Sequence, residues 1–133
     1  MLSLQSKLYQ LGTAFSAAVT NCYHYWRPVK DLPCLMWAES GEESSFYSDN
    51  MKTEQNITGT CDFYTKTEFD PLIDAVQSTF ETLGITWALN SVQYEQETNL
   101  IHYEWTWGVA VYGEVPSGEG DGSIPDPAPQ PGI

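Results

Sequence analysis

Residues 85–112 read ITWALNSVQYEQETNLIHYEWTWGVAVY and hold the pattern that decides the fold. From residue 101 onward, apolar and polar side chains alternate, and a tyrosine and two tryptophans share the apolar parity. This period of two is typical of a strand with one buried face. Residues 85–94 are rich in strand-favouring Ile, Trp, Leu, Val and Tyr. Because the polar segment 95–99 has the length of a hairpin loop, the stretch predicts a long antiparallel hairpin that carries an aromatic stripe.

Two segments of the chain supply an apolar cover for this stripe, in which each packed aromatic side chain buries roughly 150–250 Å². Residues 3–19 place apolar side chains at steps of three and four, with Ser3 as a candidate N-cap. Residues 70–83 begin with Asp70 as N-cap and a proline at the first helical position, and a glycine follows them. We expect both segments to be helices that lie on the aromatic face of the sheet.

The remaining strands are shorter in the sequence pattern. Residues 22–26 form an aromatic run that stops before a proline, and residues 34–39 form a second run. Residues 40–50 are polar and acidic, which predicts a loop, and residues 55–65 predict a strand with a bulge or a close backbone approach at Gly59. Helices and strands do not alternate strictly, so the fold class is predicted to be α+β with a mainly antiparallel sheet.

A change of composition divides the chain into two parts. Residues 114–133 hold five of the eight prolines and four acidic residues, with no basic residue. Such a segment buries too little apolar surface to offset the entropy lost on ordering. We therefore predict one folded domain at residues 1–113 and an acidic, Pro/Gly-rich extended tail at residues 114–133.

The charge of the chain excludes several classes of function. The 133 residues include 5 basic and 18 acidic side chains, giving a formal net charge of −13 and a sequence pI of about 4.1. Specific nucleic-acid binding and attachment to anionic membranes both need basic patches, so neither is expected. No apolar run approaches the roughly 20 residues of a membrane span, and the N-terminus lacks the pattern of a signal peptide.

Candidate catalytic and metal-binding groups are few. The odd number of cysteines, Cys22, Cys34 and Cys61, favours free buried thiols in a reducing compartment over disulfides. His102 and Glu104 form an H-x-E pair that would point to one face of a strand, and His24 would have to complete a metal site. The simpler interpretation is a polar pair on a solvent or interface face. No phosphate-binding loop or nucleophile elbow is present, so we predict no enzyme and no cofactor.

Exposed aromatic and acidic side chains make the loops candidates for protein contacts. Phe46 and Tyr47 either form a contact segment or pin the loop to the body of the domain. Tyr94 and Tyr112 are left uncovered on the last strands, and such aromatic side chains favour a protein interface. The candidate interface residues are Phe46, Tyr47, Asp49, Glu95, Glu97, Asn99 and Tyr112.

Three stretches of the chain resemble one viral family. They are TCDFYTKTEFDPLIDAVQSTFETLGITWALNSVQYEQETNLIHYEWTW at residues 60–107, YWRP at 25–28 and PCLMWAE at 33–39. These stretches, and the order of helix, strands, helix and hairpin, resemble the tail-terminator or tail-completion proteins of long-tailed bacteriophages, which are often described as minor capsid proteins. The resemblance covers roughly residues 1–110 and excludes the acidic tail, which departs from the compact members.

The resemblance implies a non-catalytic protein of the virion, made in the cytoplasm of the bacterial host. Six copies would close a ring at the head-proximal end of the tail tube, stop growth of the tube and present a surface to the head connector. DNA would pass through the ring without specific binding. The alternatives are another head–tail joining or tail-tube protein of the same particle and, in a different class, a small metal-dependent enzyme using His24, His102 and Glu104.

Overall fold

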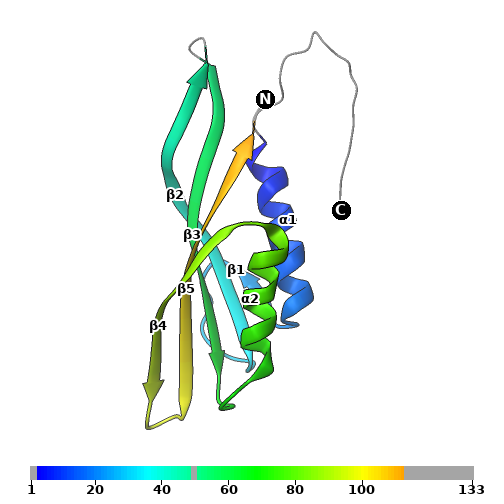
Figure 1. Ribbon diagram of the computed structural model, residues 1–133. Coiled ribbons are helices and arrows are strands. Elements are labelled where there is room, and N and C mark those ends of the chain that lie inside the picture. Colours follow the sequence, from blue (N-terminus) through cyan, green and yellow to red (C-terminus); the bar gives the residue numbers. More distant parts are fainter. Residues whose placement is uncertain (1–2, 49–50, 113–133) are drawn as a thin grey trace.

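The structure, a computed structural model, describes residues 3–48 and 51–112. It contains two helices, α1 (Leu4–Ala18) and α2 (Pro71–Leu83). The strands in chain order are β1 (Cys22–His24), β2 (Cys34–Ser48), β3 (Met51–Thr65), β4 (Thr86–Glu95) and β5 (Leu100–Tyr112). The predicted α+β class is confirmed (Figure 1). The predicted tail at residues 114–133 lies outside the described residues, so the domain boundary near residue 113 stays a prediction.

The five strands form one sheet in the order β1-β2-β3-β5-β4. The β1–β2 pair is parallel and the other three pairs are antiparallel, so the sheet is mainly antiparallel as predicted. β1 and β4 form the two edges of this sheet. Figure 1 shows that the β2–β3 hairpin extends past the helices at one end of the sheet, and that the β4–β5 hairpin extends past α2 at the opposite end.

The strand register sets β1 level with part of β4 on the opposite edge. Cys22 of β1 pairs with Leu35, which pairs with Phe63 of β3. Phe63 pairs with Tyr103 of β5, and Tyr103 pairs with Val92 of β4. One row of residues therefore runs straight across the sheet from Cys22 to Val92.

Both helices lie on one face of the sheet, which we name the helix-side face, and the other is the open face (Figure 1). Phe80 of α2 packs edge-on against Trp105, with ring centroids 5.9 Å apart, and Phe15 of α1 lies 5.4 Å from Trp37. The buried cluster comprises Leu8, Leu11, Phe15, Val19, Leu35, Trp37, Ile57, Cys61, Phe63, Val76, Phe80, Ile85, Trp105, Trp107 and Val111. The aromatic stripe of the last strand is therefore the core, and the helices cover it as expected.

The second helix begins and ends where its sequence predicts. Asp70 Oδ1 accepts a hydrogen bond from the backbone N–H of Leu72 at 2.9 Å, and Pro71 occupies the first helical position. Gly84 follows the helix with a left-handed φ of 68°, which a residue without a Cβ adopts at little cost. Within the described residues, neither helix has the length and apolar character needed to cross a membrane.

The predicted loop at residues 40–50 is wrong, because most of it belongs to β2. β2 continues to Ser48, and β3 already begins at Met51 rather than at residue 55. The backbone of this long hairpin is paired up to Ser48 and Met51, with register shifts after Glu39 and Glu42. Because the hairpin extends beyond the helices, neither of its faces requires apolar side chains, and the polar sequence resembles that of a loop.

The first strand is shorter than the predicted range of residues 22–26, because it ends at His24. The next residue, Tyr25, has a φ of 78°, in the left-handed region that side chains rarely adopt. Its backbone N–H donates a hydrogen bond to the carbonyl of Trp37 at 2.7 Å, which holds this conformation. The chain therefore turns away from the sheet three residues before the proline that was expected to end the strand.

Candidate interaction surfaces

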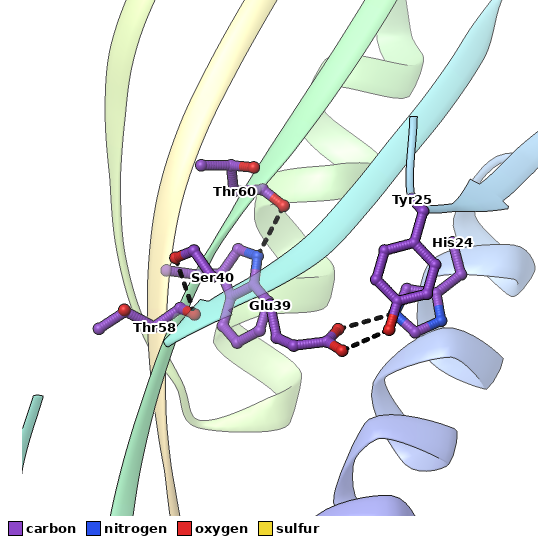
Figure 2. Close-up of polar contacts among 7 residues, drawn as sticks. His24, Tyr25, Glu39, Ser40, Thr58 and Thr60 are labelled. Atoms are coloured by element: carbon purple, nitrogen blue, oxygen red, sulfur yellow. Dashed lines mark hydrogen bonds and ion pairs between the residues drawn. The ribbon is translucent and has the colours of Figure 1, made fainter. Parts of the chain in front are cut away.

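The first histidine is held in a stack of rings at the β1 edge (Figure 2). The His24 ring lies between Tyr25, at 3.8 Å between centroids, and Trp37, at 3.9 Å. His24 Nε2 is 2.7 Å from Glu39 Oε1, and the Tyr25 hydroxyl donates to Glu39 Oε2 at 2.6 Å. Desolvation raises the pKa of the Glu39 carboxyl, but the bonds from Tyr25 and His24 outweigh it, so this pKa is lower than usual. The cluster fixes the side chains at this edge.

The second histidine lies on the open face. His102 Nε2 is 2.7 Å from Asp62 Oδ1, and the His102 ring stacks on Tyr64 with centroids 4.3 Å apart. Desolvation raises the pKa of the Asp62 carboxyl; the bond to His102 opposes this shift, and the nearby charge of Glu104 adds to it. His102 and Glu104 thus share a face as predicted, in a half-buried polar group.

The metal site proposed as an alternative is wrong in its geometry. His24 pairs in register with Trp37, whose side chain belongs to the helix-side core, whereas His102 lies on the open face. A sheet therefore separates His24 from His102 and Glu104. Among residues 3–48 and 51–112, no three or more His, Cys, Asp or Glu side chains are grouped to hold a metal ion.

The three cysteines are free thiols, as predicted. Cys34 and Cys61 are buried and Cys22 is half-buried. Burial raises the pKa of all three thiols, most strongly that of Cys61. A raised thiol pKa lowers the fraction of reactive thiolate at neutral pH, so the cysteines act as small apolar side chains.

Two of the predicted interface residues, Phe46 and Tyr47, fall on the β2–β3 hairpin. Phe46 pairs with Glu54 and Tyr47 pairs with Lys52 through the backbone. The side chains of residues 44–48 and 51 are not described, and Asp49 lies outside the described residues. A contact role for this hairpin therefore stays a prediction.

The other predicted interface residues divide between the two ends of the sheet. Glu95, Glu97 and Asn99 are exposed at the β4–β5 turn, where Asn99 has a φ of 59° and its side chain accepts a hydrogen bond from the Tyr94 hydroxyl at 2.8 Å. Tyr112 is exposed at the other end of β5, where it pairs with Glu54 of the β2–β3 hairpin. The predicted residues thus do not form one surface.

An uncovered apolar surface lies beside the β4–β5 turn, and of its residues only Tyr94 was expected to be uncovered. Leu89, Val92 and Tyr94 of β4 are 46%, 50% and 58% exposed, and we name these three residues the hairpin patch. Their partners on β5 are Trp105, Tyr103 and Ile101. Trp105 belongs to the helix-side core and Tyr103 packs against it. Ile101 lines a hollow beside Tyr94. The patch therefore faces the helix side, where the hairpin extends past α2.

A β-bulge explains why this patch is not visible in the sequence. The register of β4 shifts between Leu89 and Ser91, so Asn90 is the extra residue. Leu89 and Val92, three positions apart, therefore share one face. In an unbroken strand their side chains would point to opposite faces, and no parity pattern would group them.

Phe69 extends the apolar surface at this end of the molecule. It lies in the loop between β3 and α2 and is 88% exposed, with a left-handed φ of 60°. Together with Tyr94, Ile101 and Tyr103 it lines an open hollow of about 650 Å³. An exposed phenylalanine in a strained backbone gains little within its own chain, and such positions are common at contact sites.

The opposite edge of the sheet carries a groove between α1 and β1. Its volume is about 600 Å³, and its lining includes Leu8, Tyr9, Gly12, Thr13, His24 and Trp37. Tyr9 on its rim is 79% exposed. We name this hollow the α1–β1 groove.

A basic segment follows β1 in this strongly acidic molecule, and its Arg27 lies over the ring of Tyr23, which alternates along β1 with the groove residues Cys22 and His24. Arg27 and Lys30, two of the five basic residues of the chain, are exposed in the loop between β1 and β2. Trp26 and Val29 are exposed in the same loop. Within the described residues, neither Arg27 nor Lys30 belongs to any of the ion pairs. We name residues 26–31 the basic loop.

The open face carries a broad shallow hollow of about 950 Å³ that is lined largely by small and hydroxyl side chains. Thr58, Thr60, Thr106 and Gly108 are among them. A face of threonine and glycine offers hydrogen bonds and flat contact. Such a surface is suited to packing against another protein.

Comparison with solved structures places the fold among known ones. It is similar to a chain in a structure described as the virion of native gene transfer agent (GTA) particle, with a TM-score of 0.54 and 13% sequence identity. The match covers 84% of this chain and 96% of that chain. Neither a protein-family model nor a curated protein matches the sequence. At this level of identity the likeness establishes the fold.

Proposed function

We propose that the protein is a structural component of a phage-type virion. It forms a ring at the head-proximal end of the tail tube, ends growth of the tube and joins the tail to the head connector. The observation that carries this proposal is the likeness of nearly the whole domain to a chain of a gene transfer agent virion. The resemblance of residues 60–107 to tail-terminator proteins supports the finer assignment within the particle.

The distribution of exposed surface supports a junction role. A subunit of such a ring needs one surface for the tube, another for the connector and two lateral surfaces for its neighbours. The described chain has protruding hairpins at both ends of its sheet and uncovered apolar side chains at an edge. The grouping of His24, His102 and Glu104 that an enzyme would need is not formed.

The charge of the chain supports a conduit for DNA. Six copies would carry a large excess of negative charge, since each has a formal net charge of −13. Phosphate groups are repelled by such a surface, so DNA would pass through the ring without adhering. A neutral or basic lumen would count against this part of the proposal.

Copy number separates the proposed role from its alternatives in the same particle. Quantitative mass spectrometry of purified particles would measure this chain against the major tail-tube protein. A tail terminator in one ring gives about six copies per particle, whatever the tail length. Copies that increase with tail length would identify a tube protein, and a chain missing from intact particles would refute the virion role.

A further inference from the structure

We infer that the two edges of the sheet bind one another in successive copies of the chain. The hairpin patch of one subunit docks into the α1–β1 groove of the next subunit. The inference rests on the proposed ring, and it names the lateral surfaces that the proposal leaves open. A head-to-tail contact of this kind is heterologous, and a heterologous contact generates a closed ring when its rotation closes.

The apolar side chains of the patch require a partner. Leu89, Val92 and Tyr94 are each about half exposed and lie together on one strand. Phe69 and its open hollow extend this surface beside Tyr94. Scattered exposed apolar residues are ordinary, but a contiguous group at an open sheet edge marks an interaction site or an aggregation hazard.

The groove lies at the matching place on the other edge. Residues of one sheet row connect Cys22 of β1 with Val92 of β4, and a second row connects His24 with Leu89. The patch and the groove therefore lie at the same level of the sheet and on the same helix side. Side-by-side copies bring them together with little stagger, which suits closure of a ring rather than growth of a helix.

The strand directions agree with this arrangement. β1 is parallel to β2, and three antiparallel steps lead from β2 through β3 and β5 to β4. β4 is thus antiparallel to β1, and the β1 of a neighbouring copy in the same orientation would also be antiparallel to it. The bulge at Asn90 and the three-residue length of β1 limit backbone pairing, so side chains supply most of the contact.

The groove is a rigid receptor. One wall is the stack of His24 on Trp37, which Glu39 fixes through its bond to His24. The floor is open because Gly12 has no side chain, and a Cβ there would lie 3.0 Å from the Trp37 ring. A hollow of about 600 Å³ accommodates an aromatic side chain such as Tyr94. Because the wall is already ordered, docking loses little side-chain entropy.

Charges beside the two surfaces are complementary. Glu95 and Glu97 flank the hairpin patch, where Lys66 offsets one negative charge, whereas Arg27 and Lys30 lie in the basic loop after β1, where Asp31 offsets one positive charge. Because the chain has few basic residues, the β1 edge is a place where the acidic residues of a neighbouring copy can approach positive charge. Such complementarity sets the register of the contact and favours pairing of the β4 edge with the β1 edge over pairing of two β4 edges or two β1 edges.

Two complementary variants test the inference. V92S/Y94S removes two of the three apolar side chains of the hairpin patch and leaves the groove intact, and T13R places a long side chain in the groove and leaves the patch intact. All three positions are exposed, so the fold is retained, as circular dichroism would check. In sedimentation velocity and native mass spectrometry, wild-type protein should form closed oligomers. Each variant alone should associate at least about tenfold more weakly.

Mixing the two variants gives the decisive result. A head-to-tail contact leaves one intact junction between the patch of T13R and the groove of V92S/Y94S, so the mixture should form 1:1 heterodimers that grow no further. S78A, altered at an exposed position of α2 outside both surfaces, should assemble as the wild type does.

Three outcomes would overturn the inference. They are wild-type protein that stays monomeric at about 1 mM, variants that assemble normally, and a mixture that forms no heterodimer. None of these decides the virion role, because copy number in particles measures that role independently. Conversely, the purified protein could form oligomers with the predicted contacts while the chain is missing from particles. That pair of results would uphold the docking and refute the proposed function.

Discussion

Gly59 of β3 lies directly against the indole of Trp107 on the neighbouring strand. A Cβ at residue 59 would lie 2.2 Å from Trp107 Cζ2 and 2.4 Å from the carbonyl oxygen of Ala38. The indole N–H donates to the Thr60 carbonyl at 2.9 Å, which holds the ring in place (Figure 2). Of the bulge or close backbone approach predicted at Gly59, the close approach is confirmed here, while the register shift next to it lies in β2 between Glu39 and Gly41.

Gly59→Ala should destabilise the fold by about 3 kcal/mol, at the upper end of the usual range for overpacking. The neighbour on one side is backbone, which cannot move without disrupting the strand ladder. Gly41→Ala is the matched control in β2, because a Cβ there meets nothing within 4 Å. Urea unfolding of both variants measures the difference, and equal stabilities would show that Trp107 does not pack as described.

Asp70→Ala should cost about 2–3 kcal/mol, from the lost cap and the orphaned hydroxyl of Thr65. Asp70 accepts bonds from the Leu72 N–H at 2.9 Å and from the buried Thr65 hydroxyl at 2.7 Å. The predicted N-cap of α1 is confirmed, because Ser3 Oγ accepts a hydrogen bond from the backbone N–H of Ser6 at 3.3 Å. This bond is long and exposed, so Ser3→Ala should cost about 0.5 kcal/mol. Thermal unfolding would rank them, and the reverse order would contradict the assignment of the caps.

Glu39→Gln should reduce stability by about 1 kcal/mol at pH 7 and have little effect near pH 3. The folded-state pKa of Glu39 lies below its ordinary value of 4.5. This carboxylate therefore stabilises the fold above pH 4.5, and the contribution is lost as the pH falls through the folded-state pKa. Unfolding in urea from pH 7 to 3 measures the effect. Glu68→Gln controls for the change in charge, and a pH-independent loss at Glu39 would reject the mechanism.

The thiols should differ in reactivity in the folded state. Ellman's reagent at pH 8 should modify the half-buried Cys22 first, and Cys34 and Cys61 only as the protein unfolds, because burial raises their pKa and blocks access. Cys22→Ser should remove the early phase. Three equally fast thiols in native buffer would contradict the described core.

The parts of the fold that could be predicted are those whose signals are local. Asp70, Pro71 and Gly84 define a helix from cap to end, and the alternation of residues 101–111 defines the buried face of β5. The β2–β3 hairpin was missed because residues 40–50 are mostly polar, and backbone pairing by itself leaves no apolar pattern in the sequence. The parallel pairing of β1 depends on contacts between distant segments, which local patterns do not contain.

The interaction surfaces were harder to predict for a different reason. Glu95, Glu97 and Asn99 were placed at an exposed turn because polar residues mark turns. The hairpin patch beside them depends on the bulge at Asn90 and on where α2 stops, and both are consequences of the tertiary structure. Which partner covers a surface is decided by a second molecule, so the sequence of one chain defines candidates only.

The most direct measurement is a three-dimensional reconstruction of purified particles in which this chain carries a C-terminal label. The account predicts one ring of six labelled copies between the end of the tail tube and the head connector, with adjacent subunits meeting through opposite sheet edges. Label repeated along the tube, or particles without any label, would contradict it.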